Sequence, residues 1–219
     1  MAFLRWQSVL EPAVEVCAVE LPGHGTRLRE PLQTCWSDLL AAIFPQIASA
    51  ATRPFAFFGH SLGGLVAFEM ARYCRRRCCP GPACLFISGC SGPRDQSRKD
   101  LHLLADDALI EVLREFNGTP PEILANRELM EILLPVIRGD LILAETYQYD
   151  SADILDVPIK VLAGSRDPDV AMEQVKGWEN ETTNGCEIKC FEGDHFFIQT
   201  QQKAVIGYVK EVLERVVSG

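Results

Sequence analysis

The stretch from Gly59 to Gly63 reads Gly-His-Ser-Leu-Gly, and its serine is the residue best placed to do chemistry. A Gly-x-Ser-x-Gly motif between a strand and a helix forms a sharp turn that exposes the serine hydroxyl at the edge of a sheet. Because glycine has no Cβ, the glycines on both sides let the strand and the helix pass closely. The sequence therefore predicts Ser61 as a nucleophile, with the backbone N–H of Leu62 directed at a developing oxyanion.

A serine hydroxyl acts as a nucleophile when a base lies within hydrogen-bond reach and an acid fixes the tautomer of that base. In α/β-hydrolases these groups occur in the order serine, acid, histidine, each after a strand. His195 follows the last apolar run of strand length and is the candidate base. The side chain of His60 should point away from its neighbour Ser61, whereas His24 and His102 precede the acid and break the order.

The candidate acid is Asp167, which lies in the loop after another apolar run of strand length. Asp169, two residues further along the chain, remains an alternative acid. Asp194 adjoins His195 and is therefore poorly placed to orient that ring. With Asp167, the predicted triad has the chain order that an α/β-hydrolase requires.

The elements that must hold these side chains alternate between strands and helices. Apolar runs of strand length predict strands at residues 14–19, 55–58, 84–88, 158–163 and 187–191. Apolar residues at helical spacing predict helices at residues 1–10, 39–43, 64–71 and about 201–217. This alternation indicates an α/β fold, with a mostly parallel sheet covered by helices on both faces.

Residues from about 98 to 150 carry helical patterns only. Asp106 or Asp107 can cap a first helix, Thr119 is a suitable start for a second, and a third is predicted over residues 127–147. Three helices inserted between strands resemble a lid. Their apolar side chains either line a slot or pack on one another.

Length and composition favour one globular domain over residues 1–219. The formal net charge of -9 argues against nonspecific binding to nucleic acid. No apolar run reaches the length that spans a membrane, and residues 1–6 lack the pattern of a signal peptide. We therefore expect a cytoplasmic protein without a membrane partner.

The nine cysteines are expected to be free thiols, because their number is odd and no secretory signal is present. Apolar neighbours place Cys17, Cys186 and Cys190 in strands. A second group crowds the Arg-rich end of the elbow helix, at positions Cys74, Cys78, Cys79 and Cys84. No second Cys/His pair at finger-like spacing completes a metal site there, so no metal is expected.

With these residues in view, the chain resembles type II thioesterases, the free-standing α/β-hydrolases that act beside fatty-acid, polyketide and nonribosomal peptide synthases. The resemblance runs over nearly the full length. The matching stretches are residues 21–25 (Leu-Pro-Gly-His-Gly) with Arg27 and Glu30, residues 57–63, residues 164–167, residues 193–197 and the pair Thr146-Tyr147.

The resemblance implies hydrolysis of acyl thioesters on the phosphopantetheine arm of an acyl or peptidyl carrier protein. Many members of this family remove aberrant acyl groups from stalled synthases, and a vertebrate branch releases medium-chain fatty acids from fatty acid synthase. The resemblance makes Ser61 the acyl acceptor, His195 the base and Asp167 the acid that orients His195. It also implies a monomer that needs no cofactor or metal. The lid would form the acyl slot and the landing surface for the carrier. Because an acidic enzyme repels an acidic carrier on average, a local basic patch is expected, with Arg94, Arg98 and Lys99 as candidates.

The chain departs from the family's pattern at its start. Members usually begin with a strand and a Gly-Gly loop, which supplies the second oxyanion donor, before the segment that resembles residues 3–10. Both are missing here, so a shortened form of low activity is expected. A general carboxylesterase or lipase, which uses the same triad, and a catalytically impaired protein that binds the carrier remain the alternative functions.

Overall fold

The structure is a computed structural model that describes residues 3–116 and 118–218. Contacts between Cα atoms divide the chain into two compact units. The first comprises Met1–Val19, Ile43–Asp95 and Tyr149–Gly219, and the second comprises Glu20–Ala42 and Gln96–Gln148. Residues 1 and 2 of the expected N-terminal helix, residue 117 of the expected lid and residue 219 at the end of the expected domain lie outside the described residues.

The first unit contains a sheet of four parallel strands in the order β1-β2-β3-β4. The strands are β1 (Ala56–His60), β2 (Cys84–Ser88), β3 (Ile159–Gly164) and β4 (Cys186–Phe191). Four of the predicted strands are thus confirmed, with β2 at the predicted bounds. Because all four strands run in the same direction, their carboxyl ends meet at one edge of the sheet.

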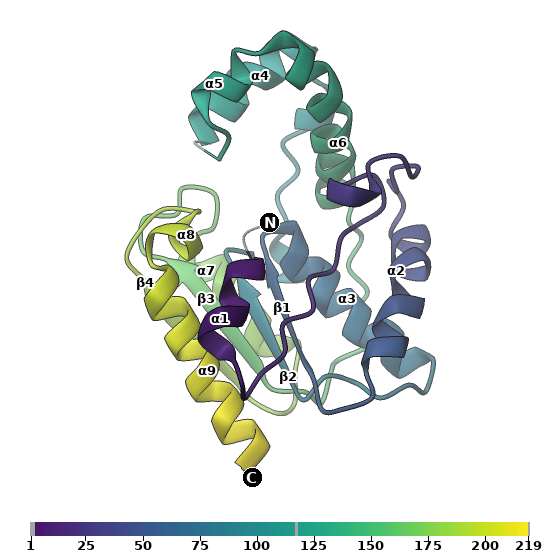
Figure 1. Cartoon of the computed structure of the whole chain (residues 1–219), viewed down its shortest axis with the longest axis vertical. Helices are drawn as coiled ribbons and strands as arrows, with labels where there is room; N and C mark the ends of the chain where they lie inside the picture. The colour runs from purple at the N-terminus through teal and green to yellow at the C-terminus, as the bar shows by residue number, and fades with distance from the viewer. Residues whose placement is uncertain (1–2, 117, 219) are drawn as a thin grey trace. The chain divides into compact units, whose positions relative to one another are not determined.

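Helices cover both faces of this sheet (Figure 1). On one face lies α3 (Leu62–Arg76), where Gly64 approaches Ile87 of β2 so closely that a Cβ would be 3.1 Å from its side chain. On the other face lies α9 (Gln202–Ser218). The buried residues of that second face form one apolar cluster that includes Phe86, Leu162, Phe191, Phe197, Val205, Val209 and Val212. Burial of each such side chain contributes about 1.5–3 kcal/mol to folding.

The N-terminal segment forms η1 (Phe3–Trp6) and α1 (Gln7–Leu10), which confirms the predicted helix over these residues. The helix ends at Leu10, and its C-cap Glu11 is extended, because Pro12 disfavours helical backbone at the residue before it. The rings of Phe3 and Trp6 pack edge to face on Phe58 of β1, with centroids 5.5 and 4.7 Å away. These aromatic contacts attach the segment to the sheet.

The strand predicted at residues 14–19 is wrong. The N–H of Val14 donates to Leu10 O at 3.1 Å, and the N–H of Val16 donates to the side-chain oxygen of Gln7 at 2.6 Å. These bonds are made to α1, and no strand in the described residues pairs with this segment. A mostly apolar run of strand length is therefore not enough to make a strand when the backbone groups find other partners.

A buried cation secures α3, the helix that begins at the elbow. Arg72 is 1% exposed and contacts Glu69 at 2.9 Å and Asp153 at 3.5 Å. Its guanidinium also lies over the rings of Phe68 and Tyr149. A buried charge is tolerated when it is paired and hydrogen-bonded in this way, so the helix is tied to the segment around Asp153.

The remaining helices of the first unit are short. They are η3 (Pro93–Asp95), α7 (Met172–Val175), η5 (Lys176–Asn180) and α8 (Phe197–Thr200). Trp178 of η5 is fully buried and donates its indole N–H to Cys90 O at 2.9 Å. This bond links η5 to the turn that follows β2.

All nine cysteines are free. Cys186 and Cys190 lie in β4 as predicted, but Cys17 lies in the segment that forms no strand. In the part of the chain that the structure describes, no group of three or more His, Cys, Asp or Glu side chains could hold a metal ion. Over the same residues, no helix has both the length and the apolar character needed to cross a membrane.

The second unit contains the helices predicted for the lid. They are α4 (Asp106–Phe116), α5 (Pro121–Leu124) and α6 (Arg127–Glu145), accompanied by η2 (Gly25–Arg27), η4 (Leu101–Leu103) and the start of α2 (Trp36–Ala50). The N-cap of α5 is Pro120 rather than the predicted Thr119, since two prolines already fix the entry to this helix. A small apolar core joins the three main helices through Leu109, Leu113, Leu124, Met130 and Leu134.

Two histidines connect α6 to other segments of the second unit. His102 of η4 bonds to Glu145, whose carboxylate also accepts the N–H groups of Leu101 and His102. His24 contacts both carboxylate oxygens of Asp140 at 3.1 Å through Nε2, and its Nδ1 lies 3.1 Å from Pro22 O. Since both neighbours of the His24 ring accept hydrogen bonds, its doubly protonated form is favoured. The pKa of His24 is accordingly raised, chiefly by the hydrogen bond to Asp140 against an opposing effect of burial.

The second unit should become less stable at alkaline pH, because the His24–Asp140 ion pair is lost when His24 gives up its proton. A raised folded-state pKa contributes stability that is complete below about 6.5, the unfolded value, and is lost as pH rises through the folded value. Amides near His24 should therefore exchange with solvent more readily at pH 8.5 than at pH 6, after correction for intrinsic rates. Asp140→Asn should lower the pKa of His24 in an NMR titration and remove this pH dependence.

Asp107→Asn is the matched control, because it removes an exposed carboxylate from the same unit without touching His24. Protection that is equal at both pH values in the unmodified protein would contradict the assignment.

Candidate active site

Ser61 lies at a strained turn between β1 and α3. Its φ of 53° and ψ of -124° are unusual for a residue with a side chain, and such backbone strain costs about 1–3 kcal/mol. The turn is held by two backbone hydrogen bonds of 2.8 Å, from Ser61 N to Ser88 O and from Gly64 N to Ser61 O. The sequence motif thus produces the sharp strand-to-helix turn that was expected of it.

The two glycines of the motif differ in how much space a side chain would have. A Cβ at Gly59 would lie 1.9 Å from the carbonyl oxygen of Gly63, so the start of α3 passes too close to permit any side chain. A Cβ at Gly63 would meet nothing within 4 Å. The expectation that both glycines avoid a clash is therefore wrong for Gly63, because its Cβ would point into open space.

Leu62 is the first residue of α3, directly after Ser61. The first N–H groups of a helix have no acceptor within the helix, and the helix dipole adds partial positive charge there. The N–H of Leu62 is thus available to an oxygen that develops negative charge beside Ser61.

His195 and Asp167 are joined at the same edge of the sheet. Nδ1 of His195 lies 2.7 Å from Oδ2 of Asp167, and the Asp167 side chain is only 1% exposed. Burial tends to raise the pKa of Asp167, but hydrogen bonds from His195, Asp169 and Val170 outweigh this and lower it. Asp167 is therefore ionised at neutral pH and can hold the His195 ring in one tautomer.

Backbone contacts bring the loops of these two residues together. The N–H of Arg166 donates to Gly193 O at 2.8 Å, and the N–H of Ser165 donates to Phe191 O at 2.8 Å. A Cβ at Gly164 would lie 2.5 Å from Asp194 O, so this position leaves no space for a side chain. The pairing of β3 with β4 thus continues into the loops and fixes their separation.

The alternative acids contact other groups. Asp169 donates its backbone N–H to Oδ1 of Asp167 at 2.9 Å, so its backbone supports the carboxylate beside His195. Asp194 accepts the N–H of Phe196 at 2.9 Å and caps the turn after β4. The carboxylate that lies within hydrogen-bond distance of His195 Nδ1 belongs to Asp167.

The other histidines are placed as follows. His24 and His102 belong to the second unit and bond to its carboxylates. His60 is half-buried, and its ring lies beside that of His195 with centroids 4.9 Å apart. Within the described residues, no hydrogen bond joins Ser61 to His195; catalytic hydrogen bonds of this type are often long before substrate binds.

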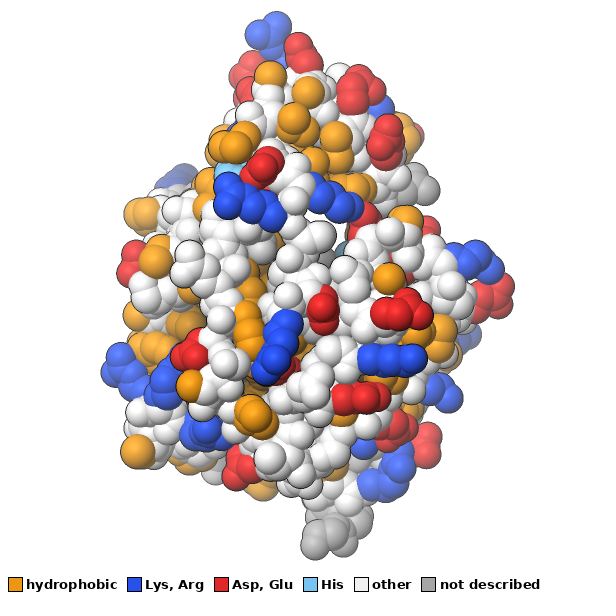
Figure 2. Space-filling model, turned by 180° about the vertical axis from the view of Figure 1, so that it is seen from behind, with side chains coloured by type: hydrophobic (Ala, Val, Ile, Leu, Met, Phe, Trp, Pro, Cys, Tyr) orange, Lys and Arg blue, Asp and Glu red, His pale blue; other side chains and the backbone are white. Residues whose placement is uncertain are grey.

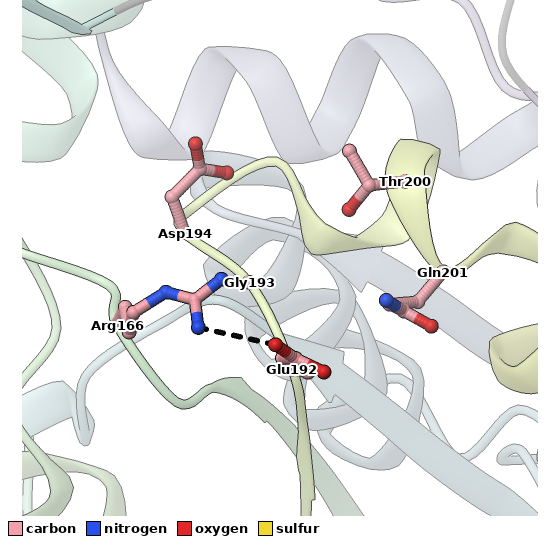
Figure 3. A pocket seen from close by; sticks show the side chains of 6 residues that line it. All are labelled: Arg166, Glu192, Gly193, Asp194, Thr200 and Gln201. Carbon is pink, nitrogen blue, oxygen red and sulfur yellow. Dashed lines mark hydrogen bonds and ion pairs between the residues drawn. The ribbon is translucent and has the colours of Figure 1, made fainter.

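Residues of the loops after β3 and β4, together with the end of α8, line a polar pocket (Figure 3). It is lined by Arg166, Glu192, Gly193, Asp194, Thr200 and Gln201. Arg166 and Glu192 form an ion pair across it at 3.2 Å, and both side chains are mostly exposed. A surface ion pair of this kind contributes little free energy to folding.

Sequence reasoning missed the roles of Ser88, the last residue of β2, and of Gly89, which follows it. Ser88 is fully buried and bonds to both Ser61 and His60. Gly89 has a φ of +54° and leaves no space for a Cβ beside His60. The signal for them in the sequence is their position at the end of a predicted strand that neighbours the elbow strand.

The chain is similar to known thioesterases and to proteins of peptide biosynthesis. The family model described as Thioesterase domain matches residues 1–213. The gramicidin S biosynthesis protein GrsT of Aneurinibacillus migulanus is 33% identical over 218 residues, which cover 99% of this chain and 85% of GrsT.

Two solved structures share the fold over almost the whole chain. ClbQ from the colibactin NRPS/PKS pathway has a TM-score of 0.93 and 35% identity, covering 100% of this chain and 93% of ClbQ. The type II thioesterase BorB from the borrelidin biosynthetic cluster has a TM-score of 0.86 and 32% identity, covering 95% of this chain and 85% of BorB. The chain therefore has the α/β-hydrolase fold and belongs to the thioesterase domain family, as a thioester hydrolase related to type II thioesterases.

Proposed function

We propose that this chain hydrolyses acyl thioesters on the phosphopantetheine arm of a carrier protein, with Ser61, His195 and Asp167 as its catalytic triad. The observation that supports the proposal most strongly is the 2.7 Å contact between His195 and a buried Asp167 at the sheet edge where Ser61 occupies its strained turn. Ser61, Asp167 and His195 thus follow three different strands, and all three lie at the edge of the sheet where the carboxyl ends of those strands meet.

In the first half of the reaction, Ser61 Oγ attacks the thioester carbonyl while His195 Nε2 accepts the hydroxyl proton. The carbonyl oxygen becomes an oxyanion, to which the N–H of Leu62 donates. The bond from carbon to sulfur then breaks, and the pantetheine sulfur leaves with the electron pair and takes up the proton that His195 Nε2 received from Ser61, which returns His195 to its neutral form. Asp167 stabilises the positive charge that His195 carries in this step.

In the second half, His195 removes a proton from water, which attacks the acyl group on Ser61. The tetrahedral intermediate again places its negative oxygen near Leu62, and its collapse returns the proton to Ser61 Oγ. The products are a carboxylic acid and the free serine. Every step is a proton or acyl transfer between named groups and water, so the proposal calls on no cofactor.

The carrier protein is proposed as the partner because of the chain's relatives. GrsT takes part in gramicidin S biosynthesis, and ClbQ comes from an NRPS/PKS pathway. Synthases of these kinds hold their intermediates as thioesters on carrier domains, and the sequence resemblance implies the same substrate class here. The proposed enzyme acts as a monomer that edits or releases such chains.

Acidic side chains lie close to two of the arginines that we propose as the docking patch for the carrier. Arg94 lies over the ring of Tyr149 and 3.8 Å from the buried Glu181. Arg98 pairs with Asp100 at 2.6 Å. On the face drawn in Figure 2, basic side chains likewise stand beside acidic ones. Docking to an acidic carrier would therefore depend on a few cations rather than on a broad positive field.

The test of the proposal is hydrolysis of acyl-phosphopantetheine carrier protein with short, medium and long acyl chains. Ser61→Ala should lower kcat by about 10⁴-fold or more, because no other hydroxyl replaces the nucleophile. Ser49→Ala removes an exposed hydroxyl from α2 and should leave kcat unchanged.

Three outcomes would contradict the proposal. The triad is wrong if folded Ser61→Ala retains turnover. A preference for oxygen esters over thioesters would favour a general carboxylesterase. Tight binding of acyl-carrier without any release from the unmodified protein would favour a binding protein.

Substitution of the aspartates should separate the triad acid from its neighbour. Asp167→Asn should lower kcat by about 10³–10⁴-fold, since the amide no longer holds the required tautomer of His195. Asp169→Asn keeps the backbone N–H that supports Asp167 and should cost far less. Steady-state kinetics on the same acyl-carrier substrate compares the two variants, and an equal loss in both would contradict the role given to Asp167.

A further inference from the structure

His60 lies at the end of β1 and is anchored to the neighbouring strand. The sheet register sets His60 opposite Ser88, and His60 Nδ1 lies 3.0 Å from Ser88 Oγ. Ser88 is fully buried, so this bond is formed away from solvent. The same Ser88 accepts the N–H of Ser61 through its carbonyl oxygen. One residue of β2 therefore fixes both the nucleophile's backbone and the ring beside it.

The ring of His60 packs directly on the ring of His195. Their centroids are 4.9 Å apart with the planes tilted by 47°, and Phe197 meets His60 edge to face at 6.0 Å. Gly89 makes this approach possible. A Cβ at Gly89 would lie 2.7 Å from Cε1 of His60 and 3.4 Å from Cε1 of His195, so a side chain there would clash with the His60 ring and contact the His195 ring.

His60 remains uncharged over the working pH range. Burial, followed by the proximity of His195, lowers the pKa of His60 to about 3, although Asp167 acts in the opposite direction. An uncharged neighbour matters because His195 becomes positively charged when it accepts a proton from Ser61. A second cation at this distance would oppose that step.

The hydrogen bond to Asp167 alone does not fix the orientation of His195. A single bond at Nδ1 leaves the ring free to tilt about that bond, which would move Nε2 relative to Ser61 Oγ. A contact on the face of the ring removes this freedom. Misplacement of a catalytic group by about 1 Å can cost about 10²-fold in rate.

We propose that His60 is a positioning residue, whose ring, anchored by Ser88, holds the His195 ring on Asp167 with Nε2 directed to Ser61. This inference rests on the proposed triad. His60 touches neither the thioester nor the water, and it acts only through His195. Gly89 serves the same purpose by leaving the space between the two rings free of a side chain.

The test compares His60→Asn with the unmodified protein. Asparagine can place a polar atom near the position of Nδ1 and keep the bond to Ser88, but it lacks the part of the ring that contacts His195. We expect kcat on acyl-carrier to fall by about tenfold to a hundredfold with KM nearly unchanged. The low-field proton resonance of the bond between His195 and Asp167 should broaden or disappear, because the His195 ring is no longer held.

Ser88→Ala tests the anchor, and Cys84→Ala is the matched control. Ser88→Ala keeps the His60 ring but removes its hydrogen bond to Ser88 Oγ. The same changes in kcat and in the resonance should therefore appear to a smaller extent. Cys84 is fully buried at the other end of the same strand, and its substitution should lower stability without affecting kcat or the resonance. If His60→Asn fails to fold, Ser88→Ala decides with the same two measurements.

The inference is overturned if folded His60→Asn keeps the kcat and the resonance of the unmodified protein. It is also overturned if kcat falls while the resonance stays sharp, or if Cys84→Ala loses as much activity. Failure of the triad itself is recognised separately, because Ser61→Ala would then retain turnover. Loss of activity in Ser61→Ala together with normal His60→Asn rejects only the role of His60.

Discussion

The in-register pairing of β1 with β2 is the constraint on which the candidate site depends. It sets His60 opposite Ser88, so that the carbonyl of Ser88 holds the strained turn at Ser61 and its hydroxyl holds the neighbouring ring. Parallel pairing of β3 and β4 then brings the loops of Asp167 and His195 to the same edge. A strained serine, its adjacent histidine and a buried carboxylate are thus fixed by strand register more than by contacts among themselves.

The parts of the fold that the sequence predicted are those with a local signal. Residues 84–88 form β2 at the predicted bounds, and all five are buried, as is typical of a short apolar run in a parallel sheet covered on both faces. The helix at 106–116 follows from its own apolar spacing and acidic start. The elbow at Ser61 was predicted from five residues, since the motif itself requires the turn.

The parts that sequence reasoning could not predict depend on partners far along the chain. Residues 14–19 have the apolar character and length of a strand, but backbone N–H groups of this segment bond to α1 instead. The choice between Asp167 and Asp169 follows from loop geometry, which composition does not encode. The contact of His60 with His195 arises from sheet register and from the missing side chain at Gly89. Each of these depends on distances across the sheet.

The central claim is that Ser61 carries the acyl group, and mass-spectrometric mapping of the acyl-enzyme tests it most directly. The protein would be mixed with acyl-carrier, quenched within one turnover and digested. We expect the acyl mass on the peptide that contains Ser61 and its loss in Ser61→Ala. The nine free cysteines are competing acyl acceptors, so the position of the adduct is informative. Turnover without any acyl group on Ser61, or an adduct on a cysteine that accounts for turnover, would contradict the claim.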